Sequence, residues 1–158
     1  MKTDETESFW NSFCRATKRG NTRYEVVALG DTPSMATELA ELVVIGRKRA
    51  TAGLLEVYLT KGEPIPEIGG FVVLTDGEGH PKCIWRTTEL RLGTLLSVDD
   101  AFAFDEGEGD RTCSSWIAEH QRFFARQSHQ CGFAMHDEVE TVFERFVIVW
   151  PPALLEGG

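Results

Sequence analysis

Leu42-Val43-Val44-Ile45-Gly46-Arg47-Lys48-Arg49-Ala50-Thr51 is the stretch where helical periodicity gives way to strand periodicity. Before it, apolar residues recur at helical spacing from Met35 to Val43, and Gly46 is well placed to cap the helix C-terminus. After it, residues 52–59 read as a strand. The stretch therefore predicts a helix-to-strand corner that holds three consecutive cations, with the Thr51 hydroxyl just beyond them.

Periodicity in the rest of the chain predicts two more helices and several strands. A first helix is expected over residues 4–18, ended by Gly20, and a later one over residues 114–127. The expected strands cover residues 24–29, 71–75, 82–92 and 143–150. No repeat or domain boundary is visible, so residues 1–158 are expected to form one α+β domain around a small sheet or barrel.

The composition is that of a soluble globular protein. Hydrophobic residues make up 42% of the 158 residues and charged residues 26%. No apolar run approaches the length of about 18 residues that spans a bilayer, so no membrane association is expected. The N-terminus shows no secretory signal, and the four cysteines are scattered without a CxxC pair. These features predict reduced thiols and a cytoplasmic protein.

The charge distribution limits the class of partner. A net charge of −9 argues against non-specific binding to duplex DNA, which requires a basic face. Cations concentrate in the first third of the chain, whereas residues 99–110 hold six carboxylates and no cation. If the two regions face each other they form a dipolar cleft, and otherwise each is a solvated surface patch.

Lys48 and Thr51 have a structural and a functional interpretation. In the structural one, Arg47, Lys48 and Arg49 offset the dipole at a helix C-terminus. In the functional one, Lys48 is partly buried, where desolvation lowers its pKa and a nearby carboxylate opposes that shift. Lys48 could then accept the hydroxyl proton of Thr51, which would attack an amide carbonyl, or it could stabilise phosphate charge.

These residues resemble a known family. Residues 46–51 look like the G-x-K-x-x-T signature of ASCH domains, and the acidic turn 106–112 followed by Trp116 and His120 is similar to that family's longer bacterial members. The resemblance covers about residues 23–150. It implies a PUA-like β-barrel with helices packed on and around it, a cleft between barrel and helices, and a function related to RNA.

The resemblance also implies site residues. Some family members resemble ribonucleases, and some short ones hydrolyse the acetyl amide of N4-acetylcytidine with a Lys, a Thr and a Glu. Those roles would fall on Lys48, Thr51 and an acid of the 106–110 turn, for which we choose Glu108, with Glu106 and Asp110 as the other possibilities. The chain differs from the short members in its N-terminal helix and in a longer insertion around residues 93–111.

Other candidates are contacts rather than catalysts. Arg47 and Arg49 could bind phosphate beside Lys48, and Arg86 could contact a phosphate or base or pair with Glu89. Tyr24 or Trp116 could stack on a base, although core packing with a hydrogen-bonded histidine is the preferred interpretation of Trp116 and His120. His129, Cys131 and His136 lack the spacing of a zinc site, so no metal and no cofactor is expected.

Three functional hypotheses remain at this point. The first is a hydrolase that acts on RNA or a modified nucleoside in a cationic cleft, by phosphodiester cleavage or amide hydrolysis. The second is a non-catalytic module that binds RNA or a nucleotide in the same cleft. The third is a protein-interaction domain that uses its acidic surface.

Overall fold

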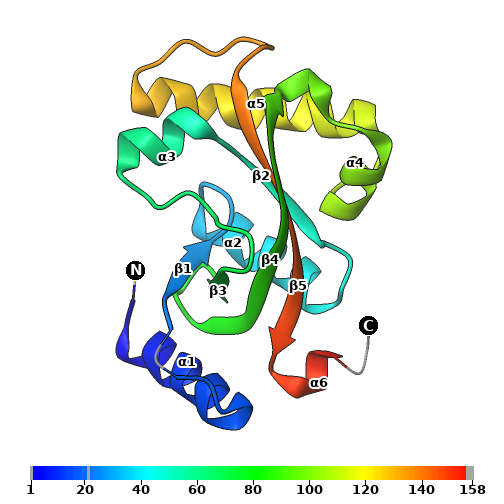
Figure 1. The fold of residues 1–158 in the computed structure, drawn as a ribbon. Coiled ribbons are helices and arrows are strands. Elements are labelled where there is room, and N and C mark those ends of the chain that lie inside the picture. Colours follow the sequence, from blue (N-terminus) through cyan, green and yellow to red (C-terminus); the bar gives the residue numbers. More distant parts are fainter. Residues whose placement is uncertain (1, 21, 156–158) are drawn as a thin grey trace.

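The computed structural model describes residues 2–20 and 22–155, and within them five strands form one mixed sheet. The strands are β1 (Tyr24–Ala28), β2 (Ala50–Leu54), β3 (Phe71–Thr75), β4 (Pro81–Thr94) and β5 (Glu140–Trp150). Their order in the sheet is β1-β3-β4-β5-β2, with β1 parallel to β3 and the other pairs antiparallel. The long strands β4 and β5 form the twisted spine of a half-barrel, whose two edges are β1 and β2 (Figure 1).

Six α-helices in the described residues surround this sheet. They are α1 (Asp4–Thr17), α2 (Pro33–Val44), α3 (Leu55–Lys61), α4 (Asp100–Glu106), α5 (Cys113–Cys131) and α6 (Pro152–Leu155), with a 3-10 turn at Leu95–Ser97. In Figure 1, α5 crosses one end of the β4–β5 spine and α1 lies at the opposite end. None of the helices in the described part of the chain is long and apolar enough to cross a membrane.

The helix boundaries follow the expected capping chemistry with one exception. Thr32 caps α2 by accepting a hydrogen bond from the Met35 N–H, and Pro33 occupies the first turn. Gly46 follows that helix with a φ of 82°, a left-handed conformation that suits glycine. The predicted end of α1 at Gly20 is wrong, because Lys18 already adopts the left-handed capping conformation with a φ of 56°.

The predicted strand over residues 52–59 is correct only in its first half. Strand β2 ends at Leu54, and residues 55–61 form α3 instead. A strand would place Val57 and Leu59 on one face, yet Val57 is buried and Leu59 is 59% exposed. Leu54, at the end of β2, and Val57, three residues later in α3, are both buried, which is a helical spacing. A short apolar run does not by itself distinguish a helix from a strand.

Helix α4 was not expected from the sequence, which suggested an acidic loop. Asp99 caps this helix by accepting a hydrogen bond from the Phe102 N–H, and Phe102 and Ala103 are buried beneath it. They belong to a core shared with α5 and β2, whereas α2 packs on a second core over β3 and β4 and α1 covers a third at the β1–β3 end. Burial of α4 carries the acidic turn that follows it towards Lys48.

Candidate functional site

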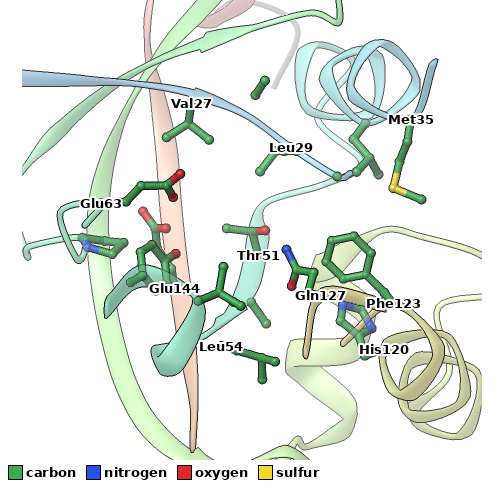
Figure 2. A pocket seen from close by; sticks show the side chains of 18 of the residues that line it. Val27, Leu29, Met35, Thr51, Leu54, Glu63, His120, Phe123, Gln127 and Glu144 are labelled. Carbon is green, nitrogen blue, oxygen red and sulfur yellow. The ribbon is translucent and has the colours of Figure 1, made fainter. Parts of the chain in front are cut away.

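A cavity of about 280 Å³ lies where the half-barrel is open, between its two edge strands. Residues of β1 and β2 form opposing walls, α3 and the loop after it close one side, and α5 closes the other. Thr51 lies between Glu63 and Glu144 on one side and His120, Phe123 and Gln127 on the other (Figure 2). Lys48, Glu106 and Glu108 also line this space.

Lys48 is buried at the cavity wall and is bonded to the acidic turn. Its side chain is 1% exposed, and its Nζ lies 2.6 Å from Glu106 Oε2 and 2.8 Å from Glu108 Oε2. A third hydrogen bond of 3.3 Å runs from Nζ to the backbone oxygen of Glu106. All three ammonium hydrogens are therefore used, and Glu108, whose side chain is 35% exposed, is the partner that a ligand could displace.

The turn after α4 approaches Lys48 closely because of Gly107. This residue has a φ of 72°, and a β-carbon on it would lie 2.3 Å from the backbone oxygen of Arg47. Arg47 in turn holds the turn, donating from Nε to the Gly107 oxygen at 2.7 Å and from Nη2 to the Gly109 oxygen at 3.0 Å. Glycine at 107 thus allows the two flanking glutamates to reach one lysine.

The charges of this cluster support one another. Burial alone would lower the pKa of Lys48, but the carboxylates of Glu106 and Glu108 outweigh burial and raise it. Burial alone would raise the pKa of Glu106, but Lys48 and then His120 hold it well below its ordinary range. Lys48 is therefore an ammonium ion at neutral pH, and the expected neutral lysine base does not fit this environment.

Glu108 and His120 complete the cluster. Burial raises the pKa of Glu108, Lys48 opposes this, and the neighbouring Glu106 adds to the increase, so the net shift is upward. His120 Nδ1 donates to the Trp116 backbone oxygen at 2.9 Å, and its Nε2 lies 3.6 Å from Glu106 Oε1. Burial disfavours the imidazolium, but the charge of Glu106 outweighs burial and raises the pKa of His120. Of the residues in this cluster, Glu108 is the best placed to exchange a proton with a ligand.

Thr51 and Glu144 are direct neighbours across the sheet. They form a register pair between β2 and β5, so their side chains project from the same face about 4.5–5.5 Å apart at Cβ. Thr51 is half-buried, and its hydroxyl makes no hydrogen bond to any described residue. The Thr51 oxygen is thus available to a ligand, with a second carboxylate beside it.

Glu144 is buried without a cation. Its Oε2 accepts hydrogen bonds from Thr87 Oγ1 at 2.7 Å and Trp85 Nε1 at 3.2 Å, and no described cation lies within 4.0 Å of the carboxylate. Burial raises the pKa of this carboxyl, while the bonds from Thr87 and Trp85 and the charge of Lys48 oppose that effect. Burial of the nearby Tyr58 phenol, together with the charge of Glu144, raises the pKa of that phenol.

The predicted cationic cleft is wrong, because the arginines that flank Lys48 point elsewhere. Arg47 bonds to the 107–109 backbone, and Arg49 pairs with Asp105 at 3.0 Å on the outside of the turn. The cavity is instead lined by more carboxylates than cations, namely Glu25, Glu63, Glu106, Glu108, Glu119 and Glu144 against Lys48, Lys61 and Arg126. The basic run and the acidic segment do face each other, and they largely neutralise each other.

The other predicted contact residues do not line this cavity. Tyr24 is buried against Trp10, with ring centroids 4.6 Å apart, in the core under α1. Arg86 is exposed on β4 near the Phe71 ring. Trp116 is buried and stacks on His120 at 3.9 Å from the core side, so that His120, and not Trp116, reaches the cavity wall. Asp110 is exposed and bonds to Thr112 at the start of α5.

Glu106, Glu108 and His120 place three potential metal-ligand atoms within 4.8 Å of one another. The Lys48 ammonium already contacts both carboxylates of this group. A divalent ion would have to displace Lys48 from a buried position, which would leave that charge without a partner. The donor set therefore fits a bound ammonium better than a metal ion.

Sequence reasoning missed Glu144, Tyr58 and the cavity role of His120. Glu144 had a signal, because it is the only acidic residue in the mostly apolar run 143–150, and a carboxylate buried there needs a reason. Tyr58 was missed because of the incorrect strand assignment. Helix α3 places its side chain over Gly53 of β2, with the phenol oxygen 3.0 Å from where a β-carbon on Gly53 would stand.

Comparisons with known proteins agree with this fold. A sequence model described as the ASCH domain matches residues 25–150. An ASCH domain structure from Lactobacillus crispatus JV V101 has a TM-score of 0.84 and 28% identity, covering 94% of this chain and 96% of that one. A structure from Enterococcus faecalis V583 has the same TM-score of 0.84 and 30% identity, covering 92% and 88%. No curated protein matches. The predicted α+β, PUA-like architecture is thus confirmed, and the chain belongs to the ASCH domain family.

Proposed function

We propose that this ASCH domain is an amidohydrolase that removes an acyl group from the exocyclic nitrogen of a modified nucleoside, of the N4-acetylcytidine type. The observation that carries the proposal is the Thr51 hydroxyl, which makes no hydrogen bond to a described residue, in the same cavity as a buried lysine–glutamate cluster. A nucleophile, a proton acceptor and a cation for the developing oxyanion are the three components of acyl transfer. Family membership adds support for a nucleic-acid-related ligand, because ASCH domains are generally RNA-binding.

The size and charge of the cavity favour a nucleoside over a polynucleotide. Its volume of about 280 Å³ is just below the range of small-molecule sites, which run from roughly 300 to 1,000 Å³. A phosphodiester backbone would meet mostly carboxylates there, whereas proteins that hold RNA chains use cationic grooves. Amide hydrolysis on a neutral nucleoside is therefore a better match than ribonuclease activity.

In the first step, Thr51 Oγ attacks the acyl carbonyl carbon and its proton passes to the Glu108 carboxylate. The raised pKa of Glu108 makes it a stronger base than an ordinary carboxylate. Once Glu108 is protonated, it no longer attracts Lys48 by charge. The Nζ hydrogen that Lys48 now donates to Glu108 at 2.8 Å can then be donated to the oxyanion. Glu106 stays bound to Lys48 and keeps the ammonium in position.

In the second step, the carbon–nitrogen bond breaks and Glu108 gives its proton to the leaving nitrogen. The acyl group is then an ester of Thr51, and the freed amino nucleoside leaves. Water attacks this ester while Glu108 accepts a proton from it, and as the second oxyanion collapses the ester C–O bond breaks and Glu108 gives that proton to the Thr51 oxygen. The products are the unmodified nucleoside and a carboxylic acid, and no external reactant besides water is consumed.

The test is direct turnover of N4-acetylcytidine by purified protein, followed by chromatography and mass spectrometry of cytidine and acetate. We expect the wild type to release both products and Glu108→Gln to be strongly impaired. Glu140→Gln is the matched control, because Glu140 is an exposed glutamate on β5 outside the cavity. A wild type that binds cytidine but leaves N4-acetylcytidine intact would overturn the enzyme proposal in favour of the non-catalytic binding module.

A further inference from the structure

A buried carboxylate with no cationic partner is the least explained feature of the cavity. Glu144 is 3% exposed, yet its Oε2 receives only the two neutral donors Thr87 and Trp85. Its Oε1 accepts no hydrogen bond from any described residue, although Glu144 lines the cavity. Among the described residues, the fully buried side-chain atoms without a hydrogen-bond partner are Glu106 Oε1 and Trp116 Nε1, so Glu144 Oε1 keeps some accessible surface and can accept a hydrogen bond from a ligand in the cavity.

The environment of Glu144 fixes which oxygen meets a ligand. Trp85 can only donate, and its Nε1 points at Oε2, so this oxygen is committed to the protein. Oε1 is the oxygen left for a ligand, and Glu144 lines the same cavity as Thr51, its cross-strand neighbour (Figure 2). A ligand atom bonded to Glu144 would therefore lie within a few ångströms of an atom under attack by Thr51.

We propose that Glu144 is a positioning and specificity residue that accepts a hydrogen bond from the N–H of the ligand's exocyclic nitrogen. The inference rests on the proposed function, and it names the substrate class: heterocycles with an amino or secondary amide nitrogen next to the ring. Once that N–H is bonded to Glu144, the adjoining acyl carbon faces Thr51. An oxygen at the same position would present lone pairs to a carboxylate and would be repelled.

The local hydrogen bonds make Glu144→Gln a discriminating variant. Its side-chain oxygen must take the place of Oε2, because Trp85 Nε1 cannot face an NH2 group. The NH2 group then points into the cavity, where the wild type has an acceptor. The substitution thus reverses the hydrogen-bonding polarity at one atom with almost no change in volume, and a purely structural role for Glu144 would be little affected.

The experiment measures dissociation constants by ligand-observed NMR for two nucleosides that differ by one amino group, cytidine and the pyrimidin-2-one ribonucleoside. Wild type is expected to prefer cytidine by about 10- to 100-fold, the range for one satisfied buried hydrogen bond. Glu144→Gln is expected to lose that preference, whereas Glu140→Gln keeps it. Thermal unfolding of each variant shows that the fold is retained.

Three outcomes would overturn the inference: no preference in the wild type, an unchanged preference in Glu144→Gln, or no binding of cytidine at all. The wild-type comparison needs no variant, so the proposal remains testable even if Glu144→Gln is unstable. Because neither nucleoside can be deacylated, the result is independent of the hydrolase proposal. If binding depends on Glu144 but N4-acetylcytidine is not turned over, the hydrolase proposal is wrong and the recognition role of Glu144 stands.

Discussion

The two sides of Thr51 hold buried carboxylates in opposite ways. On one side, Glu106 and Glu108 share the Lys48 ammonium, and the group is tied to α5 through His120. On the other side, Glu144 has only the neutral donors Trp85 and Thr87. The paired cluster is a preorganised set of charges, as catalysis requires, whereas the unpaired carboxylate is an incomplete hydrogen-bonding site, as recognition requires.

The largest effect is expected at the residue between the two sides. Thr51→Ala removes the proposed nucleophile and should lower kcat by about 10³-fold or more, while cytidine still binds. Thr51→Ser keeps a hydroxyl and should retain measurable turnover. Initial rates with N4-acetylcytidine and NMR titration with cytidine test both halves of this prediction, and an active Thr51→Ala protein would exclude covalent catalysis at this residue.

Substitutions on the two sides should differ in how much they lower the free energy of unfolding. Lys48→Met leaves Glu106 buried without its cation, which should lower the free energy of unfolding by about 3–5 kcal/mol. Glu144→Gln keeps the bonds to Trp85 and Thr87 and should cost about 1 kcal/mol or less. Urea denaturation measures both, and similar values for the two variants would remove the distinction between paired and unpaired carboxylates.

The close approach of the 106–108 turn to Lys48 gives a smaller prediction. Gly107→Ala forces a left-handed φ on alanine and sets its β-carbon against the Arg47 oxygen. We expect a loss of about 1–3 kcal/mol in the free energy of unfolding. Gly109→Ala is the matched control, since its φ of 57° is also left-handed but the nearest atom to its β-carbon is the Ser115 hydroxyl at 3.2 Å. Equal losses would show that backbone conformation alone, and not the approach to Arg47, matters.

The smallest effect is in the pH dependence of stability, where Glu106 and Glu144 contribute with opposite signs. The pKa of Glu106 is lowered by folding, so its stabilisation is present above the unfolded pKa near 4.5 and is lost as pH falls below it. The pKa of Glu144 is raised by folding, so it costs stability as pH rises above 4.5. Glu106→Gln should lose less free energy of unfolding than the wild type as the pH falls. Glu144→Gln should become more stable relative to the wild type as the pH rises. Each difference should be at most about 1.4 kcal/mol per pH unit.

The parts of the fold that were predicted correctly are those in which periodicity and capping agree. Pro33 and Gly46 mark the two ends of α2, with Thr32 or Asp31 expected as its N-cap, and the strand at 71–75 is apolar up to Thr75. Helix α3 was missed because a short apolar run such as residues 52–59 fits a helix as well as a strand, and only the burial of Val57 with Leu59 exposed decides between them. Local sequence does not contain that information.

The candidate site was predicted for the residues that are close in sequence and missed where the sheet brings distant residues together. Lys48 and Thr51, which are three residues apart, line one cavity together with Glu108, which was assigned from the family resemblance and lies 60 residues beyond Lys48. Glu144 reaches Thr51 only through the β2–β5 pairing, and no spacing in one chain reveals that register. Arg47 and Arg49 were assigned to a ligand because their anionic partners, the turn backbone and Asp105, lie more than fifty residues away.

The most direct test measures kcat and KM of N4-acetylcytidine hydrolysis for Glu108→Gln and Glu144→Gln side by side. We predict that Glu108→Gln lowers kcat by about 10²- to 10⁴-fold with KM near the wild-type value. Glu144→Gln should instead raise KM by about 10- to 100-fold with kcat little changed. The division of the cavity into a catalytic and a recognition side would be contradicted if both variants changed the same parameter, or if the wild type showed no turnover.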